Sequence, residues 1–168
     1  MSFQTTVRAD LRSGVIGEIA FDGPTRAASA MLDSGAGAAN NIVGRAFTYA
    51  SAENNTVAAG GAGAFAGILI QPKSYALRGT AAGGTLADSL LLPDGTPVEL
   101  LQMGEVFVSL ASDAATIGSP VKFVNATGAL DFGAPAAGET AVPNATVVRV
   151  KPSPTAAGAY LAVIRLTN

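Results

Sequence analysis

The stretch Glu105–Leu110, EVFVSL, decides the fold, because apolar and polar side chains alternate along it. Alternation with a period of two residues places every second side chain on the same face of a β-strand. The same kind of pattern recurs in Val15–Phe21, VIGEIAF, and in Tyr160–Leu166, YLAVIRL. These three stretches predict a protein built on β-strands.

Further short runs on either side of this stretch are rich in β-branched and aromatic residues and also predict strands. They are Val43–Tyr49, Phe65–Ile70, Val98–Gln102, Val121–Val124 and Thr146–Val150. Turn-forming residues separate the runs, at Asp22–Pro24, Asn54–Asn55, Pro93–Gly95 and Asn125–Gly128. No stretch keeps a convincing helical spacing, and Arg26–Met31 predicts one short helix at most. About eight strands with such turns predict an all-β fold, a single jelly-roll-like sandwich or barrel.

The chain divides into an arm and a domain. Residues 1–12 precede the first strong strand and predict an extended N-terminal arm, and residues 13–168 predict a single β-domain. Gly60–Gly63 and Gly79–Thr85 predict Gly/Ala-rich loops, and Ser34–Ala39 predicts a second extended piece. A loop that contains two prolines, at 152 and 154, is expected before the last strand.

Composition excludes several classes of partner. The net charge is −2 and the pI is about 5.0. No basic patch is visible, which disfavours nucleic-acid binding. The charge-free stretch between Glu53 and Lys73 is too polar and too rich in glycine for a membrane span, and the N-terminus lacks the apolar region of a signal peptide. Charged residues make up 13% of the chain, against about 25% in a typical domain, so the surface suits close packing against another protein.

The residue types needed for most enzyme chemistry are missing. The sequence has no histidine and no cysteine, which excludes Ser-His-Asp and Cys-His arrangements and the usual zinc ligands. Two carboxylate pairs, Asp94 with Glu99 and Glu18 with Asp22, leave a small hydrolase as an alternative. Carboxylates in turns and exposed strands are usually solvated, and the glycine loops lack the ending of a phosphate-binding loop. We therefore predict no enzyme, no catalytic, metal or cofactor-binding residue, and no small-molecule substrate.

A series of short phrases in a fixed order carries a resemblance to a known family. The opening MSFQTT leads into GVIGEIAFDGP at Gly14–Pro24 and GRAF at Gly44–Phe47. GILIQPKSYALRGTAAGGTL at Gly67–Leu86, LPDGT at Leu92–Thr96 and QMG at Gln102–Gly104 follow, then IGSPV at Ile117–Val121 and the final LAVIRLTN. Together they resemble the structural cement proteins, which decorate the capsids of tailed bacteriophages and prophages.

The resemblance implies a jelly-roll-like domain on the capsid exterior that bridges neighbouring major capsid proteins. It implies the virion as the location, after synthesis in the cytoplasm of the bacterial host. The expected partners are the major capsid protein and further copies of this chain, with a homodimer favoured and a trimer as the alternative. Neither nucleic acid nor membrane is expected as a partner. The family has no catalytic residues to carry over, and no short motif defines its capsid contacts.

The predicted arm supplies the candidate contact residues. It combines one aromatic side chain, Phe3, with two cations, Arg8 and Arg12. An arm of this kind can add a strand to a neighbouring sheet or lie in a groove between subunits. The alternative is a frayed tail without a function.

A glycan-binding β-sandwich of a virion or cell surface is the second functional reading. Three tyrosines, Tyr49, Tyr75 and Tyr160, could form an aromatic platform for a sugar. Each of them lies in or beside a predicted strand, so packing in the core or at a sheet edge is the simpler explanation.

Overall fold

The computed structural model describes residues 14–51, 55–71, 91–111, 114–154 and 160–167, and of residues 151–154 it describes the backbone alone. Three groups of predicted features lie outside these residues. They are the arm at residues 1–12 with Phe3, Arg8 and Arg12, the loop at Gly79–Thr85, and Tyr75.

The described chain is almost entirely β-structure, which confirms the predicted all-β fold. The first five elements are β1 (Arg26–Leu32), the 3-10 helix η1 (Gly35–Asn40), β2 (Ala46–Ser51), β3 (Thr56–Ala59) and β4 (Phe65–Leu69). The remaining five are β5 (Pro97–Leu110), β6 (Pro120–Val124), β7 (Leu130–Phe132), β8 (Glu139–Pro154) and β9 (Tyr160–Leu166).

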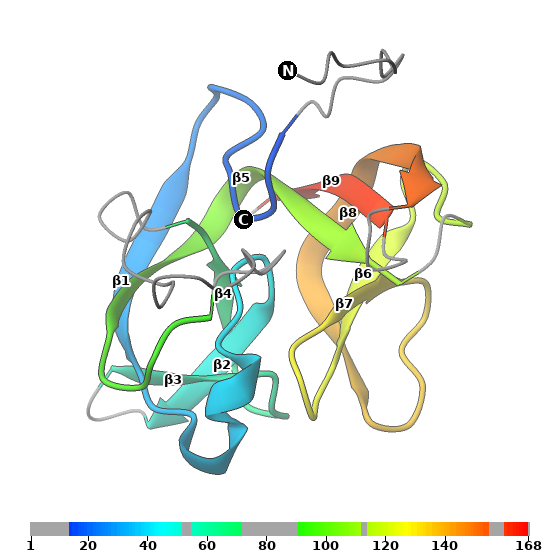
Figure 1. The fold of residues 1–168 in the computed structure, drawn as a ribbon. Coiled ribbons are helices and arrows are strands. Elements are labelled where there is room, and N and C mark those ends of the chain that lie inside the picture. The colour runs from blue at the N-terminus through cyan, green and yellow to red at the C-terminus, as the bar shows by residue number, and fades with distance from the viewer. Residues whose placement is uncertain (1–13, 52–54, 72–90, 112–113, 155–159, 168) are drawn as a thin grey trace, which may run out of the picture.

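The strands close into two small barrels that share β5. The ladder runs β1-β3-β2-β4-β5-β7-β6-β8-β9, and additional pairings join β1 to β5 and β5 to β9. The first barrel therefore consists of β1 to β5, and the second consists of β5 to β9. Figure 1 shows the two barrels side by side, with β5 passing from one to the other. Closure of both ladders leaves short exposed sheet edges, which limits edge-to-edge aggregation.

The shared strand changes partners halfway along its length. Its first half, from Pro97 to Met103, pairs with β1, and its second half, from Gly104 to Leu110, pairs with β9. Gly104 stands at the change with a φ of +127°, a conformation that a residue with a side chain rarely adopts. The sequence predicted two separate strands here, Val98–Gln102 and Glu105–Leu110. They form one strand because this glycine bends the backbone without ending the pairing.

The apolar core consists of separate clusters, and the largest of them includes residues of both barrels. One cluster lies inside the first barrel and includes the fully buried Phe47 and Leu69. A larger cluster fills the second barrel and extends to Ile68 of β4. Phe65 of β4 packs against Phe123 of β6, with ring centroids 6.3 Å apart, which is within the usual range for aromatic pairs. The two barrels therefore share a packed interface in addition to a strand.

A turn of the second barrel is docked onto the first. All four carbonyl groups of Asn125–Gly128 accept hydrogen bonds from the first barrel. The Gly61 amide donates to the Asn125 carbonyl (2.7 Å), and Asn40 Nδ2 donates to that of Ala126 (3.5 Å). Arg45 Nη1 donates to the Thr127 carbonyl (3.0 Å), and the Ala46 amide donates to that of Gly128 (2.9 Å). Burial lowers the pKa of the Arg45 guanidinium, although an arginine stays protonated in proteins. The sequence predicted a turn at these residues, and the structure confirms it.

Most of the predicted strands are present. Tyr160–Leu166 forms β9 with the predicted bounds, while Phe65–Ile70 and Val121–Val124 correspond to β4 and β6 within one residue. Val43–Tyr49 is displaced, because β2 begins only at Ala46. Thr146–Val150 is the centre of the much longer β8. The short strands β3 and β7, with four and three residues, were not predicted from the sequence.

The prediction of a strand at Val15–Phe21 is wrong. The segment lies along β5 and forms a single bridge pair, Ile19 with Val106. Gly17, in the middle of the segment, has a φ of +82° and breaks the extended backbone. The alternating pattern still describes burial, because Ile16 and Ala20 pack on the outer face of the second barrel. Their neighbours Val15, Ile19 and Phe21 are exposed.

Three other local predictions are also corrected. Arg26–Met31 lies in β1 and not in a helix, because its backbone pairs along β5 and this tertiary pairing overrides the helix propensity of alanine. Ser34–Ala39, predicted to be extended, is mostly the 3-10 helix η1. Pro152 and Pro154, predicted in a loop, belong to the end of β8, where a missing amide is tolerated because only one side of the strand is paired.

The turn at Pro93–Gly95 agrees with its prediction. Gly95 has a φ of +75°, and a Cβ placed on it would touch nothing within 4 Å. Glycine is favoured here by backbone conformation alone. Its amide donates to the carbonyl of Leu32 at 2.8 Å, which fixes the turn against β1.

Candidate functional site

The first described residues, which follow the predicted arm, pack against the shared strand. Gly14, the first described residue, lies on the ring of Phe107, and a Cβ at this position would overlap with that ring. The Gly17 amide donates to the Phe107 carbonyl at 2.7 Å, and the Gln71 amide donates to the Gly17 carbonyl at 2.9 Å. The position at which residues 1–13 join the domain is therefore fixed by β5.

A groove lies next to this attachment. It has a volume of about 390 Å³ and is lined chiefly by Phe21, Pro24, Met103, Glu105, Arg165 and Leu166. These residues come from the N-terminal segment, the middle of β5 and the end of β9. Phe21 is 63% exposed, so a large aromatic side chain faces solvent at the groove.

An ion pair forms one wall of the groove. Arg165 Nη2 lies 2.6 Å from Glu105 Oε1, and Arg165 Nε donates to the same oxygen at 2.9 Å. Glu105 and Arg165 are also directly opposite one another in the β5–β9 ladder. This cross-strand pair holds a charged rim in place beside apolar side chains.

One member of each carboxylate pair of the enzyme alternative, Asp94 and Glu18, accepts structural hydrogen bonds from the backbone. Asp94 accepts hydrogen bonds from the Ser34 amide (3.0 Å), the Gly35 amide (2.8 Å) and Asn41 Nδ2 (2.7 Å). The bond from Ser34, with those from Asn41 and Gly35, lowers the pKa of Asp94 against a smaller, opposing effect of burial. Asp94 therefore caps η1 from a distant turn. In the second pair, Glu18 Oε2 accepts from the Val15 amide at 3.1 Å.

Replacing Asp94 with alanine should destabilise the fold by about 1 kcal/mol at pH 7, the usual effect of removing a helix-capping side chain. Because folding lowers the pKa of Asp94, its contribution is present above the unfolded pKa of about 3.9 and is lost as the pH falls through the folded value. Urea denaturation of wild type and Asp94→Ala at pH 7 and pH 3 measures both effects. The difference should shrink at pH 3, and Asp22→Asn serves as the control. An equal difference at both pH values would contradict the capping role.

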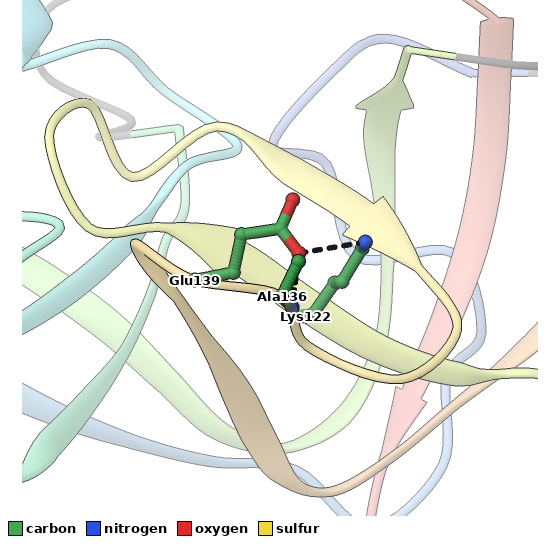
Figure 2. Close-up of polar contacts among 3 residues, drawn as sticks. All are labelled: Lys122, Ala136 and Glu139. Atoms are coloured by element: carbon green, nitrogen blue, oxygen red, sulfur yellow. Dashed lines mark hydrogen bonds and ion pairs between the residues drawn. The ribbon is translucent and has the colours of Figure 1, made fainter.

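Figure 2 shows a second polar contact, on the second barrel. Lys122 Nζ lies 2.7 Å from Glu139 Oε2, and the same oxygen accepts from the Ala136 amide at 2.7 Å. The Lys122 hydrogen bond, followed by that of Ala136, lowers the pKa of Glu139. These contacts tie the loop before β8 to β6, and they give the pair a structural role.

The described tyrosines do not form a platform. Tyr49 lies on β2 of the first barrel, and Tyr160 begins β9 of the second. Tyr49 is partly exposed and Tyr160 is half-buried. An aromatic surface for a sugar would need such rings on one face, and the fold separates these two.

Among the residues that the structure describes, no group of three or more acidic side chains is placed to hold a metal ion. No helix found there is long and apolar enough to cross a membrane.

The groove was not predicted from the sequence. Its lining residues come from three separated parts of the chain, and nothing in their sequence marks them as neighbours. The one available signal was Phe21, an aromatic residue directly before the Asp22–Pro24 turn.

Comparisons with known proteins agree with the sequence-based resemblance. Residues 3–167 match the model of the family described as "Structural cement protein (E217 gp24/Pam3 gp6)". No curated protein matches the chain. A chain of the solved structure "The capsid of Myoviridae Phage XM1" has a similar fold, with a TM-score of 0.64 and 19% sequence identity. That alignment covers 100% of this chain and 99% of the other.

The family match extends over almost the whole chain, including both barrels and the predicted arm. It confirms the predicted resemblance and a structural role in association with a phage capsid. The chain therefore belongs to the structural cement protein family.

Proposed function

We propose that this protein binds the outer surface of a tailed-phage capsid and cements neighbouring major capsid proteins. The observation that carries the proposal is the family match over residues 3–167. The family is described as structural, which supports a non-catalytic role and favours capsid binding over the glycan-binding alternative. The protein would be made in the host cytoplasm and would act on the exterior of the virion.

Shell stabilisation follows from selective binding. A ligand that binds the assembled lattice, and not loose subunits, stabilises each site by RT ln(1 + [L]/Kd), or about 2.7 kcal/mol when its concentration is a hundredfold above Kd. Because one shell has many identical sites, this small free energy per site adds up to a large total. The low content of charged residues, 13%, suits an interface that removes water from a large surface.

The contact residues belong to the N-terminal arm in this proposal. Phe3 would provide an aromatic anchor to a neighbouring protein subunit, and Arg8 and Arg12 would provide cations that bond to carbonyl or carboxylate groups of the capsid. The fixed attachment at Gly14 supports the arm as a contact element, because it determines where the arm leaves the domain. The protein would act as a homo-oligomer, with a dimer favoured over a trimer.

Adding purified protein to phage shells that lack their cement protein tests the proposal. The protein should sediment with intact shells, raise their melting temperature, and remain accessible to an added protease or antibody. The control is unassembled major capsid protein, which should bind much more weakly. Equal binding to loose subunits, or no binding to shells, would contradict the cementing role.

A further inference from the structure

The groove between Phe21, the middle of β5 and the end of β9 shares no residue with the proposed capsid contacts. We infer that it is the docking site for Phe3 in the N-terminal arm of a second copy of this chain. This inference rests on the proposed homo-oligomer and goes further, because it names the two surfaces that meet. The shape of the groove, the charges near it and the length of the arm support this docking.

The groove suits an aromatic side chain. Its volume of about 390 Å³ lies at the small end of the range for sites that bind organic groups. Phe21, Pro24, Met103 and Leu166 supply apolar surface, and methionine adapts well to an incoming ring. The exposed ring of Phe21 gains an apolar partner when another aromatic residue packs against it.

The charges around the groove complement those of the arm. The two charged lining residues, Glu105 and Arg165, pair with one another. The segment 14–24, which supplies Phe21 and Pro24 to the groove, carries Glu18 and Asp22 and no cation, a net charge of −2. Residues 1–12 carry Arg8, Arg12 and Asp10, a net charge of +1 from two positive charges and one negative. Opposite charges of this kind favour encounter and fix the orientation of a bound segment.

The length of the arm favours a neighbour over its own groove. Gly14 lies on Phe107, and the groove includes Gly104, three residues further back on the same strand. Three strand residues span only about 10 Å. Phe3 is 11 positions before Gly14 (14 − 3), and an extended chain of that length reaches about 36 Å. Extended as the sequence predicts, the arm would pass its own groove and reach another copy.

A two-fold arrangement would satisfy both copies at once. The base of the arm and the groove are both on β5, so each copy can extend its arm to the groove of the other. An exchange of this kind forms a closed, isologous dimer and leaves no unmatched surface to build a fibre.

Cysteine cross-linking of the full chain tests this inference, because the sequence contains no cysteine of its own. A tagged Gln4→Cys chain is mixed with an untagged Pro24→Cys chain and oxidised. Gln4 is next to Phe3, which keeps its ring, and Pro24 lines the groove. We expect a disulfide-linked heterodimer of the two chains on a non-reducing gel. The matched control replaces the second chain with Ile117→Cys, an exposed position in the second barrel, and should give almost none.

Two further variants separate docking from random collision. Adding Phe3→Ser to the Gln4→Cys chain, or Phe21→Ser to the Pro24→Cys chain, should reduce the yield on the order of tenfold, since each removes one aromatic partner. Phe21 is exposed, so its replacement should leave the fold intact, and circular dichroism verifies this. Equal cross-linking with Ile117→Cys would overturn the inference. So would a Gln4→Cys, Pro24→Cys double variant that closes only within one chain, because the arm would then occupy its own groove.

The experiment contains no capsid. A negative result would therefore contradict the exchange of arms between copies. It would not bear on capsid binding, which the experiment with shells tests.

Discussion

Gly128→Ala should destabilise the fold by about 3 kcal/mol or more, a severe loss for a single substitution. Gly128 has a φ of +69°, and a Cβ at this position would overlap with the Ala46 carbonyl oxygen and lie 2.8 Å from the Gly60 amide nitrogen. Both neighbours are backbone atoms, so they cannot move aside as a flexible side chain can. The docked turn Asn125–Gly128 would have to separate from the first barrel and lose its hydrogen bonds.

Gly118→Ala is the matched control for this prediction. Gly118 also has a positive φ, +89°, but a Cβ placed there touches nothing within 4 Å. Its substitution should cost about 1 kcal/mol, from backbone strain alone. Urea denaturation of both variants gives the two losses of unfolding free energy, and their difference measures the contact between the barrels. Similar losses would mean that the turn can leave its docked position at little cost.

Deleting residues 2–12 should weaken binding to shells by about thirtyfold or more, while each β-domain keeps its own stability. The arm would contribute its arginines to the shell and would hold neighbouring copies together through Phe3, and a combined contribution of at least about 2 kcal/mol corresponds to that factor. The arm lies outside the described residues, and the buried core is formed by residues that follow it, so we expect its loss to leave the core unchanged. Co-sedimentation with shells and thermal denaturation of the free protein give the two measurements.

A double substitution, Arg8→Ala with Arg12→Ala, refines the test of the arm. If the arginines act by charge, the loss of binding should be largest at low salt and smaller near 1 M, where the screening length is about 3 Å. If the truncated protein binds shells as tightly as the full chain, the arm is not the anchor. The Gly/Ala-rich loops then become the better candidates.

The alternating pattern allowed the all-β fold to be predicted, but it did not show which segments form the backbone hydrogen bonds of a paired strand. In Glu105–Leu110 the pattern coincides with a paired strand. In Val15–Phe21 the same pattern describes a segment with one buried face and a single bridge pair. The difference is Gly17, whose positive φ interrupts the backbone without disturbing the burial of Ile16 and Ala20. The burial of side chains follows a period that can be read from the sequence, whereas backbone pairing depends on a partner strand elsewhere in the chain.

The groove and the docked turn could not be predicted for a related reason. The turn Asn125–Gly128 was visible in the sequence, but its four acceptors are backbone carbonyls, which every residue has. The groove joins Phe21, Met103 and Leu166, which approach one another only after the ladders have closed. Both features depend on tertiary placement. The arm, by contrast, was proposed from its sequence, and its residues lie outside the described part of the chain.

The sharing of β5 by the two barrels imposes an order on folding during synthesis. All strands of the first barrel have been made once the ribosome passes Leu110, whereas the second barrel still needs β9, which ends at Leu166. Until then, the second half of β5 lacks the strand that it pairs with from Gly104 to Leu110. The first barrel can therefore form while the chain is growing, and the second has to wait for its distant partner, a long-range pairing of the kind that makes folding slow.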